Sequence, residues 1–243
     1  MPNPAQSSPA QSRSASDRWV ALAGCDNFRD LGGYRTADGF LVRRGRIFRS
    51  DGLHGLEPDD LTTLHDLRVR TVYDLRMPEE VEEYGVGPWY DAVQAPRLVA
   101  LPLYDVVPVE WFERPAPRTG ADVGARYLEM LQNRPEQLLR LVRDLGREET
   151  YPAVVHCLAG RDRTGSIAAL LLTVLGVAPA DVEADYALTG KAITDPPVLP
   201  STMAALLDAL TDGYGGAEGF VRAAGADDGD LQALRDRLLE PGD

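Results

Sequence analysis

The stretch that decides the fold is Val154–Gly165, which reads VVHCLAGRDRTG. Its two valines are typical of the end of a buried strand, and the apolar run Ile167–Val177 behind it is typical of a helix packed on both sides. A loop between a strand and a helix N-terminus presents unpaired backbone N–H groups at the positive end of the helix dipole. The sequence therefore predicts an anion-binding loop, with phosphate as its most natural ligand.

The side chains of this loop suit chemistry on a phosphate ester. Cys157 opens the loop, where the N–H groups and Arg163 stabilise negative charge, so we expect a thiolate near neutral pH. The planar guanidinium of Arg163 can hold two phosphate oxygens at once. Gly160 permits a backbone angle that other residues resist, Gly165 lets the helix begin close to the anion, and Thr164 places a hydroxyl beside the sulfur. The alternative for Cys157, a buried structural thiol, would leave the rest of the loop unexplained.

The pattern His156-Cys157-x-x-Gly160-x-x-Arg163-Thr164-Gly165 resembles the signature loop of the cysteine-dependent protein tyrosine phosphatases. Its form AGRDRTG is most similar to the atypical bacterial enzymes, which include secreted mycobacterial and listerial phosphatases of phosphoproteins and phosphoinositides. Those enzymes usually carry lysine where this chain has Arg161. Further segments resemble other parts of the same family, in family order, so that the resemblance extends from about residue 20 to 240: Asn27–Tyr34 (NFRDLGGY), Arg43–Ser50 and Tyr214–Val221.

The resemblance implies an α/β fold of the protein tyrosine phosphatase type, with a central, mostly parallel sheet flanked by helices, as one domain over residues 19–243. The chain itself alternates strand and helix patterns, as such a sheet requires. Residues 1–18 are rich in Ser, Ala, Pro and Gln, and we predict a disordered leader there. The predicted strands are Thr71–Leu75, Leu98–Leu103 and Pro152–Val155, and the main predicted helices are Pro58–Leu67, one from Pro78, Val123–Leu131, Leu138–Leu145, Ile167–Val177, one from Pro179, Thr202–Leu210 and Leu231–Leu239.

The expected reaction is a two-step phosphate transfer through the cysteine. Cys157 attacks phosphorus in line, Arg163 and the loop N–H groups hold the equatorial oxygens, and water then hydrolyses the cysteinyl-phosphate. His156 orients the loop by hydrogen bonding, and Thr164 stabilises the departing thiolate. No metal or other cofactor is expected. The substrate-binding set is completed by the remaining loop residues Leu158, Ala159, Gly160 and Arg161.

A carboxylic acid must protonate the leaving oxygen when that alcohol is a poor leaving group. Asp162 stands where the atypical family uses an acid, and it is our first candidate. Asp74 is the second, because it ends a predicted strand at the edge where α/β sheets place their ligands. Asp105 is the third, at the strand end where other tyrosine phosphatases carry a mobile acid loop.

Several arginines have two open interpretations. Arg29, Arg46 and Arg49 border the phosphate pocket or, as we favour, pair with acids such as Asp30 and Asp51.

Three other features near the predicted site are equally open. Arg161 binds a multiply charged headgroup or an acidic phosphopeptide, or it pairs with a local acid. Cys25 traps oxidised Cys157 in a disulfide or is a plain buried thiol, which we favour. The pair Trp111-Phe112 covers the site as a lid or, as we favour, docks a long loop onto the core.

The composition limits the classes of partner that the protein can bind. A net charge of −13 without a basic stripe argues against a nucleic-acid or anionic-membrane surface. Two cysteines and three dispersed histidines are too few for a disulfide framework or a structural zinc site. With no long apolar run and no signal sequence, we expect a cytoplasmic protein without stable membrane insertion, whose partner is a phosphorylated protein or phosphoinositide substrate.

Two rival functions stay open at this point. A sulfurtransferase or an arsenate reductase also sets a cysteine in an anion-binding turn, although such loops lack this combination of His, Cys and Arg-Thr-Gly. A catalytically silent module that binds phosphate groups is the rival from another class. A nucleotide-binding P-loop is excluded, because the chain has no Gly-x-x-x-x-Gly-Lys-Ser/Thr. The physiological substrate and the oligomeric state cannot be deduced from the sequence.

Overall fold

The computed structural model describes residues 18–91, 95–104, 119–194, 197–199 and 201–242. Its central sheet has the strand order β1-β3-β6-β4-β5, in which β1 pairs with β3 antiparallel and all other neighbours are parallel. The mostly parallel α/β fold is thus confirmed. The strands are β1 (Arg29–Asp30), β3 (Ile47–Ser50), β4 (Thr71–Asp74), β5 (Arg97–Ala100) and β6 (Ala153–His156), and β2 (Phe40–Val42) pairs with β7 (Leu239–Pro241) in a small second sheet.

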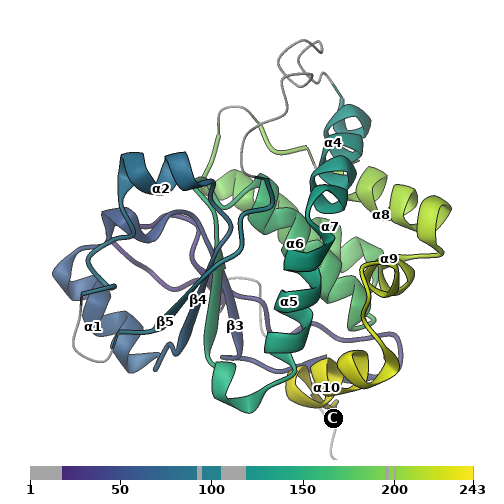
Figure 1. The fold of residues 1–243 in the computed structure, drawn as a ribbon, viewed down its shortest axis with the longest axis horizontal. Helices are drawn as coiled ribbons and strands as arrows, with labels where there is room; N and C mark the ends of the chain where they lie inside the picture. Colours follow the sequence, from purple (N-terminus) through teal and green to yellow (C-terminus); the bar gives the residue numbers. More distant parts are fainter. Residues whose placement is uncertain (1–17, 92–94, 105–118, 195–196, 200, 243) are drawn as a thin grey trace, which may run out of the picture.

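Helices lie on both sides of the central sheet (Figure 1). One side carries α1 (Pro58–Asp66), and α2 (Pro78–Tyr84) lies at the end of the sheet where the parallel strands finish. The larger helical layer on the other side is made of α4 (Gly120–Asn133), α5 (Pro135–Leu145), α6 (Asp162–Val174), α7 (Pro179–Leu188), α8 (Ser201–Tyr214), α9 (Ala217–Ala223) and α10 (Asp228–Leu238).

Most predicted elements are present with shifted ends. β5 begins and ends earlier than the predicted strand Leu98–Leu103, and α6 begins at Asp162 instead of Ile167. The early start of α6 has a local cause, because the Gly165 N–H already donates to the Arg161 carbonyl at 2.9 Å. The helix ends before Gly176, whose φ of +86° breaks it. The helix α9 and the strand β7 were not predicted, since neither has a long apolar pattern.

The central strands bury both of their faces. Successive side chains of a strand point to opposite faces, so Phe48, Val72 and Val154 pack on the α1 side while Tyr73 and Val155 pack under the large helical layer. Burial on both faces explains why these strands read as continuous apolar runs in the sequence.

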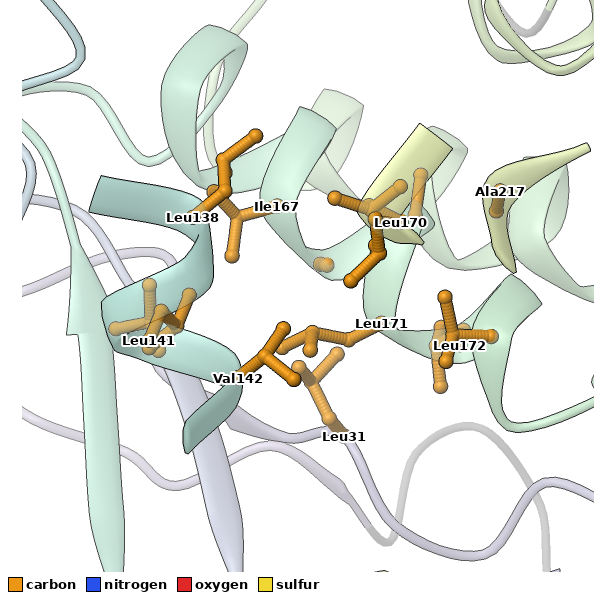
Figure 2. Close-up of a cluster of buried hydrophobic side chains, with 14 of the residues drawn as sticks. Leu31, Leu138, Leu141, Val142, Ile167, Leu170, Leu171, Leu172 and Ala217 are labelled. Carbon is orange, nitrogen blue, oxygen red and sulfur yellow. The ribbon is translucent and has the colours of Figure 1, made fainter. Parts of the chain in front are cut away.

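The helix α6 forms the centre of the large helical layer. Figure 2 shows its apolar side chains interdigitating with those of α5. From Arg163 to Leu172 every residue of α6 is buried, which confirms the prediction of a helix packed on both sides. The helix that follows the anion-binding loop is therefore fixed rigidly in the core. The side chains in that contact are Leu138, Leu141 and Val142 from α5, and Ile167, Leu170 and Leu171 from α6.

A buried ionic cluster ties α7 to the edge of the sheet. The carboxylate of Asp185, on α7, accepts hydrogen bonds from Arg49 Nη1 at 2.6 Å, from Arg29 Nε at 3.4 Å and from the Tyr34 hydroxyl at 3.0 Å. Burial alone would raise the pKa of Asp185, but Arg29, Arg49 and Arg18 outweigh it and lower this pKa to about 2. Burial and the neighbouring Arg49 lower the pKa of Arg29 to about 10, so Asp185 offsets a repulsion between two buried cations.

This cluster decides between the two interpretations of the arginines. Arg29 and Arg49 pair with an acid, as we favoured, but that acid is Asp185 and not Asp30 or Asp51. A distance of more than a hundred residues along the chain hides this partner from sequence reasoning. The third arginine, Arg46, forms an exposed pair with Glu148 at 2.7 Å.

The first prediction concerns the close approach of α4 and α8. A Cβ on Gly124 would lie 2.7 Å from the Ala205 Cβ and 2.9 Å from the Thr202 carbonyl oxygen. Gly124→Ala should therefore lower the free energy of unfolding by about 1–3 kcal/mol, measured by urea denaturation. The matched control is Gly213→Ala in α8, where a Cβ meets nothing within 4 Å and the change should stabilise by up to about 1 kcal/mol. Equal effects of the two substitutions would contradict this packing.

The second prediction concerns Asp185. Asp185→Asn leaves the buried arginines Arg18, Arg29 and Arg49 without this counter-charge and should lower the free energy of unfolding by about 3–5 kcal/mol at neutral pH. Because the pKa of Asp185 is lower in the folded state, its contribution is present above the ordinary value of 3.8 and is lost as the pH falls through about 2. The difference between wild type and variant should therefore shrink from about pH 4 downwards in urea titrations. Glu148→Gln, which breaks only exposed pairs with Arg46 and Arg237, should change little at any pH, and a pH-independent effect of Asp185→Asn would contradict the cluster.

Candidate active site

The loop between β6 and α6 turns its carbonyl groups into the surrounding scaffold. The Leu158 carbonyl accepts from the Gly52 N–H at 2.8 Å, and the Asn27 side-chain amide donates to the next two carbonyls at 3.4 and 3.2 Å. Arg49 Nη2 adds a second bond to the carbonyl of Gly160 at 2.8 Å. Because these acceptors are bonded on the outside of the loop, its N–H groups are left for the inside. This arrangement is the one that an anion-binding loop requires, and the anion itself stays a prediction.

Gly160 is required at its position for two reasons. Its φ is +67°, in the left-handed region, and a Cβ would lie 2.6 Å from the Asp51 N and the Ser50 carbonyl oxygen on the neighbouring strand end. The N–H of Gly160 donates to Sγ of Cys157 at 3.3 Å. The glycine thus lets the loop curl back so that a backbone donor meets the sulfur.

His156 supports the loop from below. It is fully buried, and its Nδ1 donates to the Cys157 carbonyl at 3.1 Å, since a carbonyl can only accept. Burial lowers the pKa of His156, so the ring is neutral at pH 7. The Thr164 hydroxyl donates to the Ser50 carbonyl at 3.3 Å, and its predicted contact with the sulfur stays a prediction.

Arg163 is held by a residue that sequence reasoning missed. Glu80, on α2, accepts from Arg163 Nη2 at 2.6 Å and also from Nη1, while Nη1 lies 3.4 Å from the Leu75 carbonyl. Burial lowers the pKa of Arg163, but the hydrogen bonds to Glu80 and the charge of Cys157 outweigh it and raise that pKa. The only sequence signal of Glu80 was its place in the first turn of α2, where it also accepts from the Met77 N–H at 2.8 Å.

Tyr104 is a second residue that the sequence did not identify. Its ring centroid lies 5.9 Å from Cζ of Arg163. Burial raises the pKa of the Tyr104 phenol, and the charges of Cys157, Glu80 and Asp162 raise it further. Tyr104 therefore lies among the catalytic candidates, on the segment that follows β5.

Asp162, the first candidate for the acid, lies at the edge of the loop. It is the first residue of α6, and 40% of its side chain is exposed. The Tyr127 hydroxyl donates to Oδ1, and Arg161 Nε lies 3.2 and 3.3 Å from the two carboxylate oxygens. Of the two interpretations of Arg161, the structure contains the pairing with a local acid.

Asp74, the second candidate, lies behind the loop. It is 3% exposed and is clasped by Arg76, with Nε 3.0 Å from Oδ1 and Nη2 2.7 Å from Oδ2. Burial alone would raise the pKa of Asp74. The charges of His156, in its protonated form, and of Arg76 outweigh burial and lower this pKa. A buried carboxylate that stays ionised is a poor proton donor. Asp105, the third candidate, lies outside the described residues, as do the pair Trp111-Phe112 and residues 1–17.

Cys25 forms a separate buried contact. Its Sγ donates to Oδ1 of Asp51 at 2.6 Å and lies 2.8 Å from the Ser50 hydroxyl. Burial and the negative charge of Asp51 raise the pKa of the Cys25 thiol. A thiol held in this protonated form is a poor redox partner, which favours the plain buried thiol.

The described part of the chain offers neither a cluster of metal ligands nor a helix fit to span a membrane. Within the ranges given above, no three His, Cys, Asp or Glu side chains lie close enough together to hold a metal ion. None of the helices described there combines the length and the apolar character that a membrane crossing needs.

Several known proteins resemble this chain in sequence or in structure. A tyrosine-protein phosphatase of Cupriavidus necator is 36% identical over 69% of this chain, a match that covers 61% of that relative's length. The triple specificity protein phosphatase PtpB of Mycobacterium tuberculosis is 27% identical, over 90% of this chain and 98% of its own. Among solved structures, TpbA of P. aeruginosa aligns over 77% of this chain and 91% of its own, with 17% identity and a TM-score of 0.40.

The family model covers nearly the whole chain. The model described as the tyrosine phosphatase family matches residues 20–240, which includes the strands of the central sheet, the loop at Cys157 and all of the helices described. The same limits follow from the motifs quoted above, at residues 27–34 near one end and 214–221 near the other. The chain therefore belongs to the tyrosine phosphatase family.

Proposed function

We propose that this protein is a cysteine-dependent phosphatase that hydrolyses phosphate monoesters, with phosphotyrosine as the first candidate substrate. The observation that carries the proposal is the Gly160 N–H donating to Sγ of Cys157, inside a loop whose carbonyls are bonded outside. Arg163 supplies a fixed cation beside this sulfur. The names of the relatives agree, since one is a tyrosine-protein phosphatase and another has triple specificity.

The first chemical step transfers the phosphoryl group to sulfur. The thiolate of Cys157 attacks phosphorus in line, the S–P bond forms and the bond to the leaving oxygen breaks. Loop N–H groups and Arg163 stabilise the charge on the equatorial oxygens. Asp162 donates its proton to the leaving oxygen, so a neutral alcohol departs.

The second step returns the enzyme to its starting state. Asp162, now ionised, takes a proton from water, whose oxygen attacks phosphorus and displaces the Cys157 thiolate. Inorganic phosphate leaves, and Asp162 is again protonated. The exposure of Asp162 at the loop edge supports this double role, whereas the buried Asp74 serves as a partner of Arg76 and His156.

The remaining residues have supporting roles in this proposal. Glu80 and Tyr104 hold Arg163 in place, and His156 fixes the loop backbone. Leu158, Ala159 and Gly160 present the N–H groups. Arg161 pairs with Asp162 at the edge of the loop. In this proposal it also binds negative groups that neighbour the phosphate on the substrate.

The loop recognises the phosphate group, which several classes of substrate share. Phosphoserine or phosphothreonine and phosphoinositides follow phosphotyrosine as candidates, because the loop chemistry is the same for all of them. The partner is thus a phosphorylated protein or phosphoinositide. We place the enzyme in the cytoplasm, where a reducing environment keeps the two free cysteines reduced.

The third prediction tests the nucleophile and the two rival functions. With EDTA present, the wild type should release phosphate from p-nitrophenyl phosphate and from members of a panel of phosphotyrosine peptides, phosphoserine peptides and phosphoinositides. Cys157→Ser should lower the rate of phosphate release at least about a thousandfold, because serine is not ionised at neutral pH. Cys25→Ser is the matched control and should retain activity. Binding of phosphopeptides without turnover by folded wild type would instead support the silent module, and turnover of thiosulfate or arsenate the other cysteine-loop enzymes.

The fourth prediction identifies the acid. Asp162→Asn should lower kcat/KM for phenyl phosphate by about 10²–10⁴-fold and should affect p-nitrophenyl phosphate much less, because a good leaving group departs without protonation. Asp74→Asn disturbs the pair with Arg76. It should lower the stability of the fold and lower kcat/KM by similar factors for both substrates. The assignment would be wrong if Asp74→Asn, and not Asp162→Asn, showed the dependence on the leaving group.

A further inference from the structure

Two buried tyrosine hydroxyls meet beside the carboxylate of Asp162. Tyr127 reaches it from α4 and Tyr186 from α7, and their rings form a T-shaped pair with centroids 6.3 Å apart. The two hydroxyl oxygens lie 2.9 Å apart, and the Tyr127 hydroxyl also contacts Oδ1 of Asp162. The tyrosines are 4% and 2% exposed, whereas the side chain of Asp162 is partly exposed. One carboxylate oxygen is therefore anchored in the protein interior.

The direction of these hydrogen bonds follows from a count of protons. A phenol has a single proton, and an ionised carboxylate can only accept, so Tyr127 donates to Asp162. Tyr186 must then donate to the oxygen of Tyr127. Burial and the negative charge of Asp162 raise the pKa of Tyr127, and burial raises that of Tyr186, so both phenols keep their protons.

The geometry also depends on the signature loop itself. A Cβ on Gly165 would lie 3.1 Å from two ring carbons of Tyr186. The glycine therefore gives room for the Tyr186 ring beside the first turn of α6. This is a different reason for Gly165 from the one that the sequence suggests, which was a close approach to the anion.

We propose that Tyr127 is a positioning residue for Asp162, and that Tyr186 holds Tyr127 in place for this role. The inference rests on the proposed function of Asp162 as the acid. With Oδ1 fixed by Tyr127, the acidic proton is carried on Oδ2, whose contact with Arg161 Nε, at 3.3 Å, is long enough to yield to the leaving oxygen. In the protonated acid Oδ1 is a carbonyl oxygen and still accepts from Tyr127, so one contact serves both protonation states of the reaction cycle.

Other charged groups that face Asp162 cannot supply this constraint. Arg161 Nε lies at similar distances from both carboxylate oxygens, 3.2 and 3.3 Å, so it does not distinguish them. Its side chain is partly exposed, and a flexible exposed pair fixes geometry weakly. The charge of Asp162 raises the pKa of the Tyr104 phenol. Tyr127 is both buried and directed at a single oxygen.

The fifth prediction tests this role with Tyr127→Phe, which keeps the ring and removes the hydroxyl. We expect kcat/KM for phenyl phosphate to fall about tenfold, which corresponds to the loss of one hydrogen bond to a charged group. For p-nitrophenyl phosphate, kcat/KM should change by less than about twofold. The alkaline limb of the kcat/KM profile for phenyl phosphate should move to higher pH, because the carboxylate form loses a donor. In a background of Asp162→Asn, the same substitution should have no further effect on the ratio between the two substrates.

The controls separate this inference from a general loss of packing. Tyr151→Phe removes another buried hydroxyl, which donates to the Leu145 carbonyl away from the loop, and should leave the ratio and the pH profile unchanged. If Tyr127→Phe does not fold, Tyr186→Phe should shift the profile in the same direction by a smaller amount. Equal losses on both substrates with an unmoved limb would overturn the inference while the acid assignment stands. A ratio that Asp162→Asn itself fails to change would refute the acid assignment and, with it, the role of Tyr127.

Discussion

The site depends on one constraint: a short loop can offer its N–H groups to an anion only if its carbonyl groups are bonded elsewhere. Three consecutive carbonyls, of residues 158–160, accept hydrogen bonds from Gly52, Asn27 and Arg49. Buried backbone groups that lack partners cost free energy, so these outer bonds are necessary. The loop is shaped from outside by segments that precede it by more than a hundred residues.

One of the residues that bond the loop from outside, Arg49, brings a buried positive charge, which needs a counter-charge. Arg49 reaches the loop from β3 only because Asp185 on α7 neutralises it together with Arg29. A buried cation without a partner costs several kcal/mol, so the strand β3, the helix α7 and the loop form one cooperative unit. Stability of the fold and shape of the anion site are therefore coupled at Arg49. Asn27 and Arg29, two residues apart in the NFRD motif, serve the two ends of this unit, since one binds the loop and the other binds Asp185.

The sequence predicts local features well and distant partners poorly. The strand, turn and helix around Cys157 depend on neighbouring residues, so the α/β class and the loop were predictable from periodicity and from the motif. The start of α6 at Asp162 was missed, because its first turn is polar and has no apolar pattern. Asp185, Glu80 and Tyr127 were missed for another reason. Each is an ordinary surface or core residue type in a helical pattern, and only the folded chain brings it to the loop.

Glu80, Tyr127 and Arg49 serve the loop for one physical reason. A loop of a few residues has too little side-chain surface to fix the orientation of its own charged groups, since flexible side chains lose entropy when they are ordered. In this protein each reactive group is held from a different element: Arg163 by Glu80 on α2, Asp162 by Tyr127 on α4, and the loop backbone by Arg49 on β3. These holders lie at the end of the central sheet (α2), in the large helical layer (α4) and in the sheet itself (β3) (Figure 1). Because a misplacement of a catalytic group by about 1 Å can cost two orders of magnitude in rate, we expect substitutions in α2 and α4 to change the activity of a loop whose own sequence is unchanged.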